Sequence, residues 1–371
     1  MRLHPLLHGA AGVAVATALA IGFQRLGIPL AYILGALVGS ALYTNLLGPI
    51  RYGKGLRRGA QLVLGAAVGA LLTPDTVSEL VRLLPIMIAA TVGLNVAGAL
   101  LAFPVARIAG VDRLTALMAC LPAGMAEMAS LAGDIGAREQ PVAVIQTLRV
   151  IIVLAVMPLW LGLADAVMPA QVTPTDPLPA DPSLLWVLGV VVAASAAFAM
   201  CLSRLGVLNP WVITPAVMSG ALIAVGWSVP PMPPIALIAA QIALGASLGI
   251  RFRVDELRSL PRAVIAGVFA ALVLIGVSFV ALAPLVAAAG GVDWRSAALA
   301  VAPGGLGEMI ASAKALGLAS AAVAGFQFVR SLLTNMFVPQ LIKLGMRRGR
   351  GVSVPGTDHR SNDAVRGRDG R

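Results

Sequence analysis

The chain has 371 residues, of which 59% are hydrophobic and only 12% are charged, and its mean hydropathy is +0.92. A soluble domain of this size carries about twice that charged fraction, so the composition excludes an ordinary soluble globular protein. Apolar stretches of about 20 residues, each long enough to cross a bilayer, recur along the sequence. We therefore expect an all-α integral membrane protein with the lipid bilayer as its first partner.

The formal net charge of +11 comes from basic residues in short connecting segments and in the segment 346–371. This distribution is typical of cytoplasmic loops that follow the positive-inside rule, so we expect no nucleic acid partner. No histidines or cysteines have the spacing of a metal or catalytic site, and the sequence predicts no metal, no cofactor and no enzyme. The segment 346–371 is polar and rich in Gly and Arg, which predicts a disordered cytoplasmic tail.

Taken in chain order, the apolar segments predict about ten transmembrane helices and two re-entrant helical hairpins. The first repeat, 1–163, holds five spans and the hairpin 112–135, and a linker follows at 164–182. The second repeat, 183–345, holds five spans and the hairpin 294–316. The expected spans are 10–26, 28–48, 59–73, 83–106 and 140–163 in the first repeat, and 184–203, 208–227, 235–250, 263–288 and 319–342 in the second.

One motif occurs twice, 181 residues apart: residues 122–128 read P-A-G-M-A-E-M, and residues 303–309 read P-G-G-L-G-E-M. Self-similarity at a fixed offset is the signature of a repeat architecture. The same offset relates five pairs of candidate residues: Pro122 and Pro303, Gly124 and Gly305, Glu127 and Glu308, Gln146 and Gln327, and Arg149 and Arg330. The chain is therefore predicted to be a tandem duplication.

The loops after equivalent spans carry opposite charge patterns. Four basic residues lie within 51–58 of the first repeat, whereas the corresponding S-V-P-P-M-P-P segment of the second is uncharged. After the next span the bias reverses: the first repeat has the acidic segment 73–79, and the second has four arginines within 251–262. Because positive loops stay in the cytoplasm, equivalent loops face opposite sides, and the two repeats are predicted to be inverted.

Inversion requires an odd number of crossings in each repeat, although each shows six apolar segments. Pro122 and Pro303 break the fifth segment into pieces of about ten residues, each long enough for half a bilayer. We therefore interpret this segment as a re-entrant hairpin, which leaves five crossings per repeat. Both termini are then expected in the cytoplasm.

The glutamate just past each break is the sharpest candidate for function. Backbone groups freed by a broken membrane helix must be satisfied by protein, water or ligand. The second half-helix also presents free N–H groups to an anion, next to Gly124 or Gly305. Glu127 and Glu308 are predicted to bind a coupling cation, to relay protons or to hold the hairpin in place.

Arg149 and Arg330 lie inside the sixth apolar segments, and each follows a glutamine, Gln146 or Gln327, on the same helix face. A buried arginine in a membrane is costly and needs a partner, for which the glutamates are the obvious candidates. Two hypotheses remain open. The charges form permanent Glu–Arg bridges that clamp the hairpin, or they bind a substrate or an ion.

The pattern Gln-x-x-x-Gly-x-x-x-Gly also occurs twice, at residues 61–69 and 241–249. Small residues at every fourth position favour close helix packing in membranes, so we interpret both segments as packing faces.

With its duplicated P-x-G-x-x-E-M and Q-x-x-R motifs, the chain resembles the AbrB membrane protein family in its duplicated Gram-negative form, from about residue 10 to 345. Its members carry two conflicting functional names, regulator of gene expression and ammonia monooxygenase. The second name implies a metal site for which this sequence has no ligand cluster. The first, taken as DNA binding, has no soluble domain to enter a groove. The resemblance implies a multi-pass protein of the bacterial inner membrane and supplies no substrate.

The expected function is a secondary transporter or exporter of a small anionic or amphipathic metabolite, working by alternating access around the hairpins. The alternative is a membrane-embedded regulator of gene expression that acts indirectly or through a cytoplasmic partner. Such a partner would dock near Arg57, near Arg251 or on the tail. The sequence leaves open whether copies of the chain form a homo-oligomer.

Overall fold

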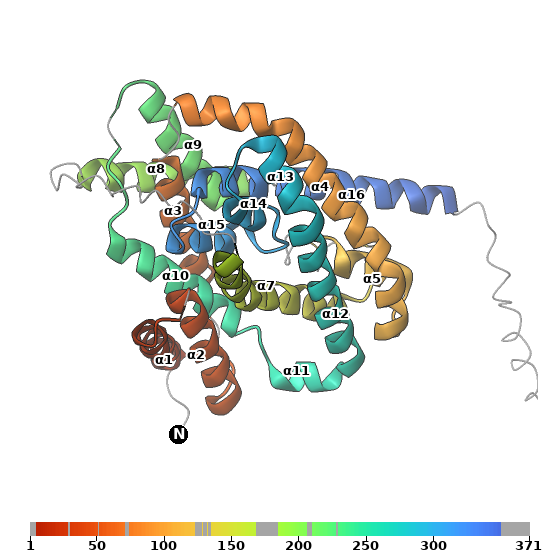
Figure 1. Ribbon diagram of the computed structural model, residues 1–371. Helices are drawn as coiled ribbons and strands as arrows, with labels where there is room; N and C mark the ends of the chain where they lie inside the picture. Colours follow the sequence, from red (N-terminus) through yellow and green to blue (C-terminus); the bar gives the residue numbers. More distant parts are fainter. Residues whose placement is uncertain are drawn as a thin grey trace, which may run out of the picture. The chain divides into compact units, whose positions relative to one another are not determined.

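The computed structural model describes residues 5–28, 30–50, 52–70, 74–122, 128, 132, 135–167, 185–205, 210–227 and 229–349. Within these ranges every regular element is a helix (Figure 1). The helices that begin within the predicted first repeat are α1 (Pro5–Arg25), α2 (Ala31–Leu47), α3 (Lys54–Gly69), α4 (Pro74–Ala109), α5 (Arg113–Cys120) and α7 (Glu139–Val167). Those that begin within the predicted second repeat are α8 (Leu185–Arg204), α9 (Pro210–Ala224), α10 (Pro234–Gly249), α11 (Val254–Ser259), α12 (Pro261–Val277), a π-helical turn (Ser278–Leu282), α13 (Ala283–Gly290), α14 (Trp294–Val301), α15 (Leu306–Ala315) and α16 (Ser320–Gly349).

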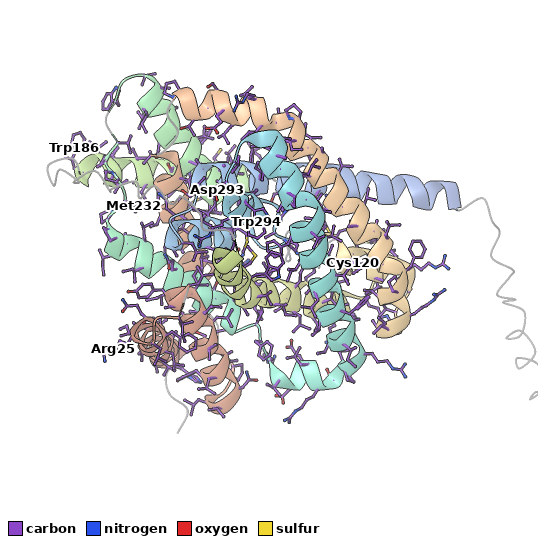
Figure 2. All side chains as sticks on the ribbon, in the orientation of Figure 1. Arg25, Cys120, Trp186, Met232, Asp293 and Trp294 are labelled. Carbon is purple, nitrogen blue, oxygen red and sulfur yellow. The ribbon has the colours of Figure 1, made fainter. Side chains whose placement is uncertain are left out.

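Five helical stretches in the described residues are long and apolar enough to cross a membrane. Large apolar side chains on several of them stay exposed; Trp186 of α8, labelled in Figure 2, is 64% exposed. Such exposure is costly in water and favourable in lipid, so the chain has the surface of a membrane protein. The five stretches are Thr76–Ala109, Glu139–Met157, Trp186–Arg204, Pro234–Ser259 and Pro261–Gly290.

Several predicted boundaries shift. The span expected at 59–73 is α3, which begins earlier, with a polar turn at Lys54. The span expected at 83–106 is part of the 36-residue helix α4. α4 continues through Pro85 and Pro104, because neighbouring helices can satisfy the backbone groups that a proline frees in a membrane helix. α16 extends to Gly349, so residues 346–349 are helical rather than part of a disordered tail. Most of the predicted linker, 168–182, and the remaining tail, 350–371, lie outside the described residues.

Two glycine-lined helices hold the repeats together. On α3, a Cβ at Gly65 or Gly69 would collide with a carbonyl oxygen of α9, at Val212 or Ala216 respectively. Such contact requires glycine, because any side chain would push the two backbones apart. The predicted packing face on residues 61–69 is therefore confirmed.

The second glycine face makes the reciprocal contact. On α10, Gly245 lies against the Ile33 carbonyl of α2, and Gly249 lies against the carbonyl of Leu37. Residue numbers rise together along both helix pairs. α3 therefore runs parallel to α9, and α10 runs parallel to α2, so that each repeat packs its third helix on the second helix of the other.

An aromatic stack fixes the start of α14. Trp160 of α7 stacks on Phe279 of the π-helical turn with ring centroids 4.5 Å apart, and on Trp294 at 5.5 Å. Trp294 is the first residue of α14 and is labelled in Figure 2. In Figure 1, the short helices α14 and α15 lie among the longer ones, and α15 contacts both α3 and α10.

Candidate functional site

The predicted break in the second repeat lies between α14 and α15. The Asp293 side chain caps α14 by accepting a hydrogen bond from the Ser296 N–H at 2.9 Å. Helix then stops at Val301 and resumes at Leu306, with Pro303 in the gap. Beyond α15, the Ala319 N–H donates to Ser296 Oγ at 2.9 Å. The chain therefore turns back at the break and returns to the level where α14 began.

The first repeat has the same contacts, 181 residues earlier. Asp112 caps α5 by accepting a hydrogen bond from the Thr115 N–H at 2.8 Å, and the Arg138 N–H donates to Thr115 Oγ1 at 3.0 Å. α5 ends at Cys120, just before the buried Pro122. The candidate residues Gly124 and Glu127 lie outside the described residues.

Gln327 and Arg330 bind the carbonyl groups left at the end of α14. The Gln327 amide donates to the oxygens of Leu299, Ala300 and Ala302 at 3.0–3.2 Å. The Arg330 guanidinium donates to Ala302 O at 2.6 Å and to Gly304 O. The last carbonyls of a helix have no intrahelical donor and carry partial negative charge, so a buried cation satisfies them well. The Q-x-x-R motif thus fastens the first half of the hairpin to α16.

Gln146 and Arg149 do the same in the first repeat. The Gln146 amide donates to Met118 O at 2.9 Å and to Leu121 O at 3.1 Å, and Arg149 donates to Leu121 O at 3.0 Å. Both arginines are buried, and the two guanidinium groups lie close enough to repel one another. Arg149 therefore binds the end of α5, and Arg330 binds the end of α14 and the gap that follows it.

Glu308 is paired with an arginine from the other repeat. Its side chain is 1% exposed in the first turn of α15, and Oε1 accepts a hydrogen bond from Arg57 Nη2 of α3 at 3.0 Å. The sequence suggested Arg149 and Arg330 as partners of the glutamates, but among the described residues the ion-pair partner of Glu308 is Arg57. Arg330 is occupied by the carbonyls of the break, whereas the polar first turn of α3 brings Arg57 to the carboxylate.

The second carboxylate oxygen, Glu308 Oε2, is buried and has no hydrogen-bond partner among the described residues. It lies against the backbone of Gly305 so closely that a methyl group at position 305 would collide with it. Arg251, just beyond the end of α10, is near enough to attract Glu308 and to repel Arg57. The site therefore contains one carboxylate and two guanidinium groups contributed by both repeats.

Arg57 and Arg251 were assigned only to topology in the sequence, as members of positive loops. One sequence signal could have placed Arg57 at the site: it lies one turn before Gln61 on the same face of α3. In the structure, the Gln61 side chain lies against Gly307, next to Glu308. Among the described residues, no three His, Cys, Asp or Glu side chains gather as a metal site. The absence of a metal remains a prediction.

Among the described residues, an all-helical fold with several apolar helices of membrane-spanning length, and with arginines buried among them, defines the class of a polytopic membrane protein. Its family follows from comparison with known sequences. The family model described as transition state regulatory protein AbrB matches residues 41–345, and the chain belongs to this family. The predicted resemblance is thus confirmed.

Two relatives match over most of their length. The chain is 25% identical over 269 residues to the Bacillus subtilis "Uncharacterized protein YhjN", covering 68% of this chain and 70% of the relative. It is 26% identical over 299 residues to the Escherichia coli "Putative regulator AbrB", covering 78% and 82%.

Proposed function

We propose that this protein is a secondary transporter or exporter of a small anionic metabolite that works by alternating access. The observation that carries the proposal is Glu308. It is a buried carboxylate at a helix break, held by Arg57 from the opposite repeat, with one oxygen left without a partner. A buried, incompletely satisfied ionisable group is costly in a membrane protein, and it typically belongs to an ion or substrate path.

The proposed architecture is two inverted repeats, each with five crossings and one re-entrant hairpin. Arg57 at the start of α3 and Arg251 beyond the end of α10 both reach Glu308, which supports an antiparallel arrangement of α3 and α10. Because α3 runs parallel to α9 and α10 runs parallel to α2, the equivalent helices α2 and α9 then run in opposite directions. This is the geometry of many secondary transporters.

The proposed location is the bacterial inner membrane, with both termini and the basic segments around Arg57 and Arg251 in the cytoplasm. Each hairpin then enters and leaves from one side. The hydrogen bonds from Ala319 to Ser296 and from Arg138 to Thr115 support this path, because they tie the exit of each hairpin to its entrance.

Alternating access gives each charged group a role. The pair Arg57–Glu308 joins the two repeats, so movement of one repeat against the other must separate it. Glu308, once released, would take up a proton or a cation and couple that uptake to the movement. The buried charges of Arg149 and Arg330 at the two breaks would raise the positive potential there and favour an anionic substrate.

The test is flux in proteoliposomes, measured with a panel of radiolabelled organic anions and with a pH-sensitive dye for protons. Glu308→Gln keeps the size of the side chain and removes its charge, so we expect at least about a tenfold loss of flux. Asp255→Asn, an exposed acid on α11, is the matched control and should retain flux. Wild-type flux in a folded Glu308→Gln protein would refute this role.

The family description and the name of the Escherichia coli relative suggest a second candidate, a membrane-embedded regulator of gene expression. It would act indirectly or through a cytoplasmic partner, not by binding DNA. Deletion of residues 350–371 separates the two functions. Transport should survive the deletion, whereas a regulator that signals through its tail should lose its effect on gene expression.

A further inference from the structure

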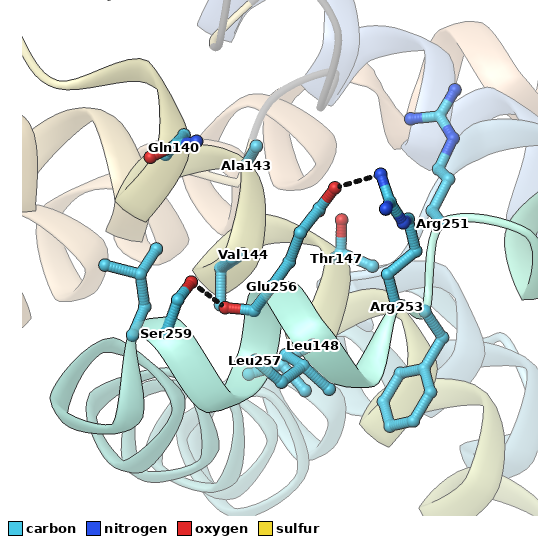
Figure 3. Close-up of a pocket in the computed structure, with 12 residues that line it drawn as sticks. Gln140, Ala143, Val144, Thr147, Leu148, Arg251, Arg253, Glu256, Leu257 and Ser259 are labelled. Atoms are coloured by element: carbon cyan, nitrogen blue, oxygen red, sulfur yellow. Dashed lines mark hydrogen bonds and ion pairs between the residues drawn. The ribbon is translucent and has the colours of Figure 1, made fainter. Parts of the chain in front are cut away.

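A cavity of about 360 Å³ lies between α7 and the connection from α10 to α12 (Figure 3). This volume is within the range of small-molecule sites. Val144 and Leu148 of α7, with Leu257 and Leu260, provide apolar walls, and Gln140 and Thr147 add polar groups. The cavity therefore suits a ligand with both an apolar and a polar part.

The charged residues that line this cavity are Arg251, Arg253 and Glu256, which together carry a net positive charge. Arg253 Nη1 donates to Glu256 Oε1 at 2.9 Å, and Figure 3 shows these two side chains pointing toward one another. The lining therefore holds two guanidinium groups for one carboxylate. Arg251 also lies near Glu308, which links the cavity to the buried carboxylate.

The wall that carries Arg251 and Arg253 is held in place by Asn45 at the end of α2. The Asn45 side-chain Nδ2 donates a hydrogen bond to Phe252 O at 2.7 Å, and the side-chain Oδ1 accepts one from the Val254 N–H at 2.8 Å. Phe252 lies between α10 and α11, and Val254 is the first residue of α11. The arginines therefore stand on an anchored segment rather than on a free loop.

A second, smaller cavity of about 140 Å³ corresponds to the first by the repeat. Ala321, Ala324, Gly325 and Phe328 of α16 line it, and each lies 181 residues after a lining residue of the first cavity, Gln140, Ala143, Val144 and Thr147. Every residue that lines the second cavity is apolar. The same position in the two repeats thus forms one cationic and one apolar cavity.

We propose that the two cavities are the access paths of the transporter on its opposite sides, and that the substrate is an amphipathic organic anion with one carboxylate and a short apolar body. This inference rests on the proposed function. Arg251 attracts the carboxylate in the first cavity, while Val144, Leu148 and Leu257 contact the apolar body. An inorganic anion would satisfy Arg251, but it would leave the apolar walls of both cavities without a matching contact.

The test is equilibrium binding to the full chain in nanodiscs of zwitterionic lipid, with hexanoate as the probe and hexanamide as its neutral match. Arg251→Gln should weaken hexanoate binding about tenfold, because it removes a charge-assisted contact. Arg251→Lys should restore most of it. Glu256→Gln removes the acidic group from the lining and should strengthen binding several-fold. Arg258→Gln makes the same charge change on α11, outside the lining, and should bind like wild type.

Repeating the titration in nanodiscs that contain anionic phosphatidylglycerol distinguishes a soluble carboxylate from the phosphate head group of a lipid as the ligand of Arg251. Equal hexanoate affinity supports a soluble substrate, and lower affinity supports the same site occupied by a lipid head. Equal affinity for hexanoate and hexanamide, or equal losses in Arg251→Gln and Arg258→Gln, would overturn the inference. Arg251-dependent binding without flux in proteoliposomes would instead overturn the proposed transport and leave the site standing.

Discussion

Arg57 and Glu308 lie 251 positions apart in the sequence, and their side chains meet at 3.0 Å. The arginine comes from the first turn of α3 and the carboxylate from the first turn of α15, so this ion pair joins the two repeats at a helix break. Arg57 is 29% exposed, whereas Glu308 is 1% exposed. Water can reach only one member of the pair.

This asymmetry predicts the result of a double-mutant cycle. Arg57→Ala leaves a buried carboxylate without its partner and should lower the free energy of unfolding. Breaking a fully buried pair typically costs about 3–5 kcal/mol. The loss here should be smaller, because Arg57 is partly exposed. Adding Glu308→Gln should restore part of the loss, since the neutral amide needs no counter-charge. Thermal unfolding in detergent measures both effects. Simple additivity of the two substitutions would show that the pair is not coupled.

The glycine faces predict that replacing glycine by alanine changes the stability of the protein very differently at two positions of α3. Gly65→Ala should lower stability by about 1–3 kcal/mol, because its methyl group collides with the Val212 carbonyl. Gly59→Ala, on the same helix, meets no atom within 4 Å and should be neutral or slightly stabilising. Unfolding by titration with sodium dodecyl sulfate compares them. Equal midpoints for the two variants would refute the close contact between α3 and α9.

The Q-x-x-R motif predicts local opening of the break. Arg330→Met removes the donors to Ala302 O and Gly304 O, so the gap between α14 and α15 should exchange its amide hydrogens at least about tenfold faster. Hydrogen exchange read by mass spectrometry over residues 299–310 measures this. The control is Arg204→Met at the exposed end of α8, and it should leave that segment unchanged.

Asp112 predicts a pH dependence at the entrance of the first hairpin. Burial acts to raise the pKa of its carboxyl, but hydrogen bonds from Thr115 and the charge of Arg138 outweigh it and leave the pKa below its usual value. A lowered pKa in the folded state means that the ionised group stabilises the fold above the unfolded pKa, and that this contribution is lost as pH falls through the folded pKa. Asp112→Asn should therefore unfold at a slightly lower temperature at pH 7, and the difference should vanish in strong acid. A difference that persists unchanged in acid would contradict this assignment.

Much of the local structure could be predicted because its causes are local. α5 and α14 end just before the proline of each duplicated motif, and Asp112 and Asp293 cap the starts of the same two helices. The helix ends before Pro122 and Pro303, and the positions of the glycine faces, followed from such signals. Helix ends such as Lys54 and Gly349 were missed, because polar turns can extend a helix beyond its apolar core.

The sequence by itself determined the membrane class and the two copies of the motif with their Gln, Arg and Glu residues. Hydropathy, a constant offset and proline chemistry are properties of the chain read in order. Only the tertiary structure decided the partners: Arg330 binds the backbone of the break, and Glu308 binds Arg57 of the other repeat. The physical reason is that any buried arginine can satisfy either a carboxylate or free carbonyls. Which of them it meets depends on how helices far apart in the sequence pack together.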